Sequence, residues 1–369
     1  MKDAPKVYFA NLRTNPNRSL IDKAGELLLR TGVCDKYGKG DIIAIKLHFG
    51  EAGNTSFIRP VFVRRIAERI KESVRGVFLT DTNTLYLGSR TNSVDHIDTA
   101  IANGFAYAVT GTPIIIADGL RGENSARVEV NGKHLKEAII AKEIISSDGI
   151  VCLTHFKCHE LTGFGGALKN MGMGCASREG KLLQHSKCAP KVNPDDCTAC
   201  GDCAMSCPSG AIEVGKKAVI KDVDCVGCGY CIAICPEGAI EVQWNELASN
   251  IQEKMAEHVK GALLGKAGKC AFMNFLTQIS PACDCYGHND APIVGDIGIL
   301  ASIDPVAIDQ ASVDLVNAKE GIKDTALASG FNQGEDKFRG VHPNIDWTVQ
   351  LEHAERLGIG KRKYELIEI

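Results

Sequence analysis

The middle of the chain reads CTACGDCAMSCPSGAIEV at 197–214 and CVGCGYCIAICPEGAIEV at 225–242, two near copies of one pattern. Each copy has the spacing C-x2-C-x2-C-x3-C-P. Together they contain eight of the 16 cysteines in this 369-residue sequence. Cysteines spaced so closely in a reducing compartment indicate metal or redox chemistry rather than disulfides.

This spacing predicts two [4Fe–4S] clusters in a small α+β module, similar to a bacterial-type ferredoxin, over residues 189–245. Three cysteines of such a run hold one cluster, and the fourth reaches the other cluster. A pair of zinc sites is the alternative, but two separated cysteine pairs per ion would leave the remaining cysteines and the repeated Cys-Pro without a role. The expected ligands are Cys197, Cys200, Cys203 and Cys235 for one cluster, and Cys225, Cys228, Cys231 and Cys207 for the other.

Outside the module, short β-branched runs alternate with amphipathic stretches. This alternation predicts one α/β domain with a mostly parallel sheet and helices on both faces, made of residues 1–188 and 246–369 and interrupted by the module. An Asn-Gly hairpin is expected at 127–135. The expected strands are 7–12, 42–49, 76–81, 113–118, 149–156, 271–280 and 293–303, and the expected helices are 19–32, 59–74, 93–104, 304–321 and 347–358.

Composition narrows the kind of partner. The formal net charge of −3 argues against a nucleic acid, which needs a clustered surplus of Lys and Arg. The N-terminal sequence does not have the pattern of a secretory leader, and no run approaches 18 apolar residues. We therefore expect a soluble, cytoplasmic protein without a membrane partner, whose partner is a redox protein or a small-molecule substrate. The sequence leaves the oligomeric state open.

A glycine-rich turn follows the expected strand 149–156. The carboxyl ends of strands are where α/β sheets bind ligands, and a helix N-terminus there attracts anions. The turn is therefore either a tight strand-to-helix connection or a cradle for a phosphate or carboxylate, including the phosphate of a flavin. No G-x-G-x-x-G fingerprint follows any expected strand. The candidate cofactor-binding residues are Gly163, Gly165, Gly166 and Asn170, and the candidate catalytic residues are His155 and Lys169.

A second set of soft ligands surrounds this turn and recurs in PACDCYGHND at 281–290. Thiolate and imidazole ligands suit iron and zinc, so these residues could complete a mononuclear metal site or contribute to a third cluster. Buried cysteines also occur as small apolar core residues, which is the alternative. The candidate ligands are Cys158, His159, Cys175, Cys283, Cys285 and His288.

Several stretches resemble the domain of unknown function 362 family, in its form with a ferredoxin domain. The resemblance covers most of the chain and implies that the cysteine module is an insertion into an α/β domain. It implies no reaction, because the family's name assigns none. The stretches that carry it are FIRPVFVRRIAERI (57–70), LTDTNTLYLGSRTN (79–92), CHELTGFGGALKNMGMGCA (158–176) and NDAPIVGDIGILASIDPVAID (289–309).

Two functions follow from these features. The first is an iron–sulfur oxidoreductase in which the module exchanges electrons with a ligand or metal in the α/β domain. The second is an electron carrier whose α/β domain only docks a partner protein. A carrier alone does not need some 300 further residues, which favours the first function.

Overall fold

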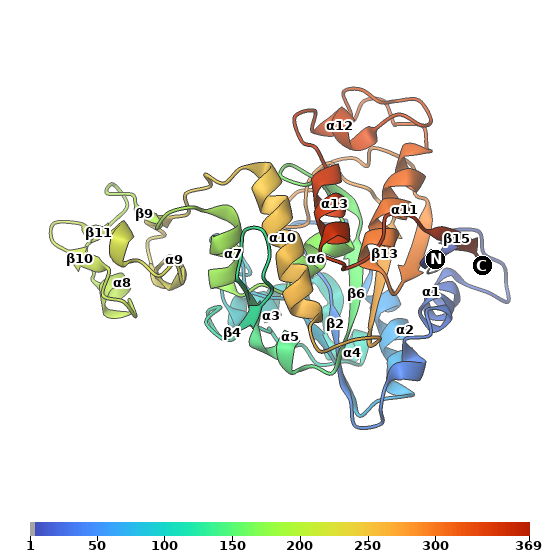
Figure 1. The fold of residues 1–369 in the computed structure, drawn as a ribbon, viewed down its shortest axis with the longest axis horizontal. Coiled ribbons are helices and arrows are strands. Elements are labelled where there is room, and N and C mark those ends of the chain that lie inside the picture. The colour runs from blue at the N-terminus through green and yellow to red at the C-terminus, as the bar shows by residue number, and fades with distance from the viewer. Residues whose placement is uncertain (1–3) are drawn as a thin grey trace.

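The structure is a computed structural model that describes residues 4–369. A seven-stranded sheet runs through its centre (Figure 1). Every neighbouring pair of strands is parallel except the two pairs that include β14, which confirms the expected α/β class with a mostly parallel sheet. In order across the sheet, the strands are β15 (Glu365–Glu368), β1 (Lys6–Asn11), β14 (Gly298–Ser302), β13 (Cys270–Leu276), β6 (Gly149–His155), β2 (Ile42–Lys46) and β3 (Gly76–Thr80).

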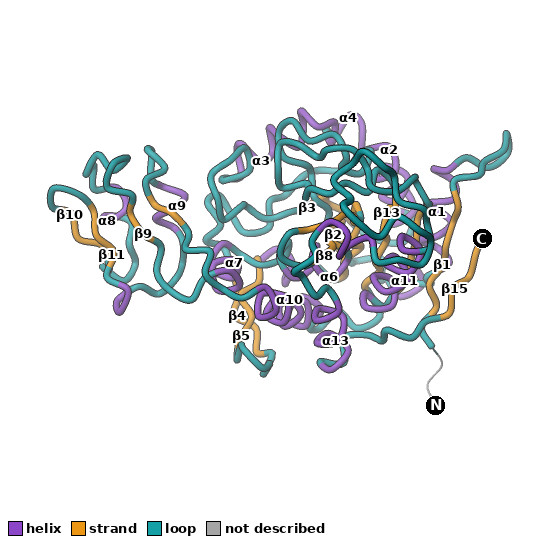
Figure 2. Tube along the Cα trace, turned by 90° about the horizontal axis from the view of Figure 1, so that it is seen from above, coloured by secondary structure: helices purple, strands orange, loops and turns teal. Residues whose placement is uncertain are grey.

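Helices cover both faces of this sheet (Figure 2). The apolar residues of α1 (Leu20–Arg30) and α2 (Pro60–Lys71) pack on one face, and those of α10 (Ala248–Leu263) and α11 (Pro305–Asn317) pack on the other. Because both faces are covered, β6 and β13 are buried along their whole length, which explains their continuous apolar sequences. The second face also holds α6 (Ala167–Gly172), α7 (Arg178–His185) and α13 (Thr348–Arg356).

The structure differs from the sequence predictions at three places. Segment 113–118 is not a strand: Ile114 makes only an isolated bridge with Leu79, and the chain then turns away at Gly119, where φ is +79°. The hairpin at 127–135 is displaced, because its strands are β4 (Ser125–Glu129) and β5 (Glu137–Ala141). The C-terminal strand β15, which the sequence did not indicate, pairs in parallel with β1.

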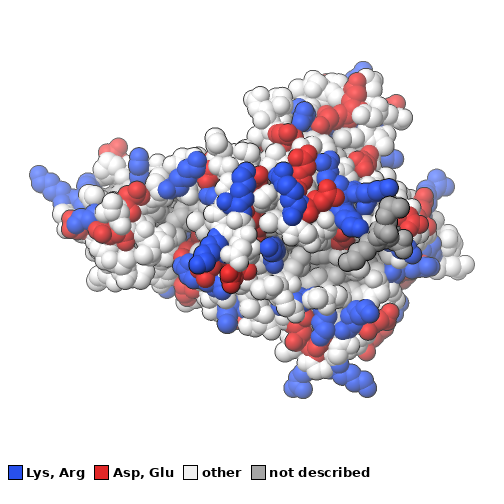
Figure 3. Space-filling model, viewed as in Figure 1, with Lys and Arg blue, Asp and Glu red and all other residues white. Residues whose placement is uncertain are grey.

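The cysteine-rich segment forms a small body at one end of the molecule (Figure 1). It contains the two-stranded sheets β9–β12 (Lys191–Val192 and Ile240–Glu241) and β10–β11 (Ile212–Val214 and Ala218–Ile220), with the short helices α8 (Asp202–Met205) and α9 (Tyr230–Ile234). Acidic and basic side chains are interspersed over the visible face of the molecule (Figure 3). Across residues 4–369, every helix is too short or too polar to span a bilayer.

The order of the strands marks a ligand-binding edge. From β2 the chain first adds β3 on one side and later β6 on the other, so the direction of winding reverses between β2 and β6. Open α/β sheets bind ligands outside the carboxyl ends of the strands at such a reversal. Lys46 ends β2 and His155 ends β6, and the segment that follows β6 holds most of the candidate residues of this domain.

Candidate functional site

The first of two cavities in the module is lined by cysteines of both repeats. Cys197, Cys200 and Cys203 come from the first repeat, and Cys235 comes from the second. The cavity is partly open, and about 340 Å³ of space outside protein atoms lies within it and at its mouth. The backbone N–H of Ala218 donates to the Cys197 sulfur over 3.5 Å, and this hydrogen bond holds the pKa of the Cys197 thiol below its ordinary value.

The second cavity has the reciprocal composition and the same volume, about 340 Å³. Its cysteines are Cys225, Cys228 and Cys231 of the second repeat and Cys207 of the first. The N–H of Gly227 donates to Cys225 over 3.4 Å, and the N–H of Ala211 donates to Cys207 over 3.3 Å. N–H groups directed at the thiols stabilise thiolate ligands and tune a bound cluster.

The spacing of these sulfurs distinguishes a cluster from a single ion. Four thiolates around one tetrahedral zinc at about 2.3 Å lie roughly 4 Å apart. Within the described part of the chain, no three of the eight module cysteines bring their sulfurs within 4.8 Å of one another. The sulfurs of each set of four are thus farther apart than one ion allows, and this separation fits a group larger than one metal ion.

The second cavity adjoins the α/β domain. Gly229, which lines this cavity, has no side chain, and a Cβ there would lie 3.2 Å from Cγ of Arg178 and 3.6 Å from Leu85. Leu85 and Leu182 of the α/β domain belong to the same apolar cluster as Ile212 and Ile232 of the module. The module therefore packs on the α/β domain beside its second set of cysteines.

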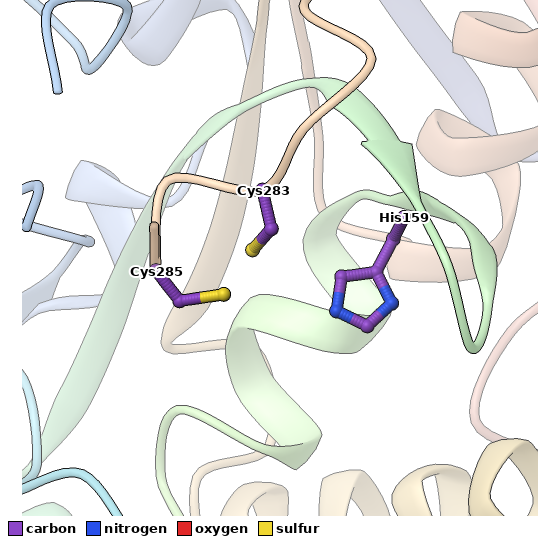
Figure 4. Close-up of side chains that lie close together, drawn as sticks. All are labelled: His159, Cys283 and Cys285. Carbon is purple, nitrogen blue, oxygen red and sulfur yellow. The ribbon is translucent and has the colours of Figure 1, made fainter. Parts of the chain in front are cut away.

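At the carboxyl edge of the sheet, one histidine and two cysteines point toward each other (Figure 4). His159 ends the short strand β7 (Lys157–His159), which follows β6, and Cys283 and Cys285 lie on the loop after β13. Their ligand atoms all lie within 4.8 Å of one another, and His159 and Cys283 are buried. We call these three residues the thiol group; their soft donor atoms are of the kind that suits iron or zinc.

Hydrogen bonds and charge make Cys283 the most acidic thiol of the group. A hydrogen bond from Cys285 holds the pKa of Cys283 well below its ordinary value, and Lys169 and His159 add to this effect against the opposing effect of burial. Lys169 Nζ lies 3.5 Å from the Cys283 sulfur. Burial works to lower the pKa of Lys169, but the charge of Cys283 outweighs it and leaves that pKa above its ordinary value. The pair therefore resembles an ammonium–thiolate ion pair.

His155, a candidate catalytic residue, is held at both ring nitrogens. Its Nδ1 lies 2.8 Å from Oδ1 of Asp284, and its Nε2 lies 3.0 Å from the carbonyl oxygen of Thr277. Lys157 Nζ lies 3.1 Å from the other oxygen of Asp284. Burial opposes ionisation of Asp284, but its neighbours His155 and Lys157 hold its pKa below the ordinary range. His155 thus positions the loop that carries the cysteines. The sequence analysis did not identify Asp284 or Lys157 as part of this site, although Asp284 stands between two cysteines in the sequence.

The glycine-rich turn holds the protein's own carboxylate in place of a phosphate. The N–H groups of Ala167 and Leu168, at the start of α6, donate to Asp309 over 2.7 and 2.9 Å. Gly166 allows this approach, since a Cβ there would overlap the Asp309 carboxylate. The other candidates of this turn have structural contacts: Gly163 lies against Trp347, Gly165 lies against Lys157 and Lys169, and Asn170 accepts a hydrogen bond from Lys46 over 2.6 Å.

The structure does not bring the remaining soft ligands into the thiol group. Cys158 precedes His159 on β7, so its side chain points to the opposite face, where it joins the apolar core. Cys175 is buried in the same core cluster, with its sulfur 4.0 Å from that of Met171. His288 is exposed and stacks on Tyr286, with ring centroids 5.5 Å apart.

Comparisons with known proteins give a family and two distant structures. A family model described as "Domain of unknown function (DUF362)" matches residues 43–314. No curated protein matches. The lactate racemase apoprotein from Thermoanaerobacterium thermosaccharolyticum aligns with a TM-score of 0.34 and 11% identity, over 75% of this chain and 51% of its own. A crystal structure of a Thermotoga maritima protein aligns with a TM-score of 0.36 and 10% identity, over 91% of this chain and 58% of its own. The chain thus spans little more than half the length of these structures.

Proposed function

This chain belongs to the domain of unknown function 362 family, and we propose that it is an iron–sulfur electron-transfer protein that works as an oxidoreductase. In this proposal the module holds two [4Fe–4S] clusters and exchanges electrons with the thiol group of the α/β domain. A [4Fe–4S] cluster supplies one-electron transfer at a potential set by its charge, hydrogen bonds and exposure.

The observation that carries the proposal is the division of the eight module cysteines between two cavities. Each cavity takes three cysteines from one repeat and one from the other, which is the pattern by which two-cluster modules ligate their clusters. Cys200 of the first cavity is exposed. A redox partner protein would therefore exchange electrons at the first cluster.

A single loop supports an internal route between the second cavity and the thiol group. Leu85 packs against Gly229, which lines the second cavity, and Leu87 lies against Gly238 of the module. Between these two leucines, the Tyr86 hydroxyl donates to the carbonyl oxygen of Cys285 over 2.9 Å. The loop that contacts the module is thus bonded to the loop that carries both cysteines of the thiol group. Electrons leaving the second cluster would reach the thiol group through this loop.

Metal and sulfide analysis tests the proposal. Anaerobically purified protein should contain about eight irons and about eight acid-labile sulfides per chain. Zinc with negligible sulfide would overturn the proposal.

Two variants test which cysteines belong together. Cys235→Ser should weaken only the first-cavity cluster, and Cys207→Ser only the second, so each should lower the iron content toward about four per chain. Electron paramagnetic resonance of the reduced protein should then lose the coupling between two neighbouring clusters. Cys188→Ser, which changes a half-buried cysteine just outside the repeats, is the matched control and should retain both clusters. If Cys235→Ser removed the cluster of its own repeat instead, the assignment of the cavities would be wrong.

A further inference from the structure

We infer that Cys283 and Cys285 form a reversible disulfide–dithiol couple, which is the two-electron acceptor of the module. This inference rests on the proposed function, which makes the thiol group the destination of the electrons. Its support comes from the hydrogen-bond donors around Cys283, the tautomer of His159 and the way the loop is held.

Three donors converge on the sulfur of Cys283. Lys169 Nζ lies 3.5 Å away, and the ligand atoms of His159 and Cys285 lie within 4.8 Å of it. Cys283 is only 1% exposed, so these groups, rather than water, surround its sulfur. A thiolate with a second thiol at its side is the reactant that attacks and forms disulfides.

The hydrogen bonds of His159 favour a role as a donor to the Cys283 sulfur over a role as a metal ligand. The backbone N–H of Leu161 donates to Nδ1 of His159 over 3.1 Å, so the ring carries its proton on Nε2. Nε2 lies 3.7 Å from a carboxylate oxygen of Glu160. A neutral histidine that binds a metal through Nε2 instead keeps its proton on Nδ1 and donates it to an acceptor. His159 is therefore arranged to donate to Cys283.

The backbone around the two cysteines is fixed on several sides. Asp284, between them, is bonded to His155 and Lys157, and its carbonyl oxygen accepts from the N–H of Glu51 over 3.0 Å. The N–H of Tyr286 donates to the carbonyl oxygen of Cys283 over 3.1 Å. Forming the disulfide requires the two sulfurs, which lie within 4.8 Å of each other, to close to a bond of about 2.05 Å.

The number of electrons needed to reduce the disulfide equals the number that the two clusters of the module can supply. Reducing the Cys283–Cys285 disulfide breaks one S–S bond and consumes two electrons and two protons. Each [4Fe–4S] cluster supplies one electron, so the two clusters together supply the pair. One proton goes to the Cys285 sulfur, and the other is shared by Cys283 and Lys169. The reverse reaction returns both electrons to the clusters and releases both protons.

Two measurements on the intact anaerobic protein test the couple. After mild oxidation, the peptide that contains residues 281–290 should be two hydrogens lighter and should resist alkylation. In protein with this disulfide, chemically reduced clusters should lose their paramagnetic signal in one turnover, at two electrons per chain. Cys283→Ser and Cys285→Ser should each abolish that loss while retaining the signal of both clusters. Cys34→Ser, which changes a buried cysteine in the core beside α1 and α2, should behave as the unchanged protein.

The outcomes separate this inference from the proposed function. Protein without iron and sulfide would refute the function itself. Protein with both clusters but no 281–290 disulfide, or with one further metal ion that either serine variant removes, would overturn the couple alone. If a serine variant removed a further metal ion, the thiol group would be a metal site. If neither variant affected metal content or electron transfer, the two cysteines would only pack in the protein interior.

Discussion

Gly166 has no side chain, and this allows the carboxylate of Asp309 to bind at the start of α6. Asp309, on α11, reaches the N–H groups of Ala167 and Leu168 and also accepts from the side chain of Asn274 over 2.8 Å. The buried carboxylate thereby joins three elements, β13, α6 and α11. The glycine therefore serves packing and helix capping, and the helix terminus is not available to an external anion.

Gly166→Ala should lower the free energy of unfolding by about 1–3 kcal/mol, because the new Cβ displaces the Asp309 carboxylate from its backbone partners. Urea denaturation followed by circular dichroism measures this change. Gly40→Ala is the control, since a Cβ at Gly40 meets no atom within 4 Å and its effect should stay within about 0.5 kcal/mol. Equal effects of the two substitutions would contradict the packing role of Gly166.

At the scale of elements, α10 organises one face of the sheet. It contacts α6, α7, α13 and β5 and is buried along most of its length. His258, in the middle of α10, is fully buried, and its Nδ1 lies 2.9 Å from the carbonyl oxygen of Lys254. Burial lowers the pKa of His258 to about 4, so the folded protein keeps this side chain neutral at physiological pH.

Acidification from pH 7 to 5 should therefore destabilise the protein. In this range the unfolded chain protonates His258 near its ordinary pKa of about 6.5, while the folded chain does not until about pH 4. The free energy of unfolding should fall by up to about 1.4 kcal/mol per pH unit from this residue alone. His258→Gln should reduce the slope measured by urea denaturation, and substitution of the exposed His288 should not. An unchanged slope in His258→Gln would show that this residue is not the source.

At the scale of the whole molecule, the sheet joins residues from both sides of the module. β6 precedes the module and pairs with β13, which follows it. β1 lies between β14 and β15, both from the C-terminal part. We propose on this basis that residues 1–188 and 246–369 form a single folding unit interrupted by residues 189–245.

Residues 246–369 expressed alone should fail to fold cooperatively, because β13 would lack β6, and β14 and β15 would both lack β1. Thermal unfolding followed by circular dichroism should show no sharp transition, and limited proteolysis should degrade the fragment rapidly. The full chain under the same conditions is the control. A stable, cooperatively unfolding fragment would refute the single folding unit.

The sequence by itself determined the features that depend on short spacing. The three cysteines that each cavity takes from one repeat are close together in the sequence, and the apolar runs of β6 and β13 follow from burial on both faces. Local patterns also predicted a helix from residue 304, and α11 begins at Pro305, with Asp304 accepting from the N–H groups of Val306 and Ala307. In each case, the physical constraint acts between near neighbours in the chain.

Only the tertiary structure decided which distant residues meet. It brought His159 to Cys283 and Cys285, while strand alternation turned the adjacent Cys158 into the core. It also placed the Asp309 side chain at the start of α6, although Asp309 lies more than 140 residues away from α6 in the sequence. These contacts depend on the path of the loops and the register of strands far apart in the chain, and no local spacing encodes either of them.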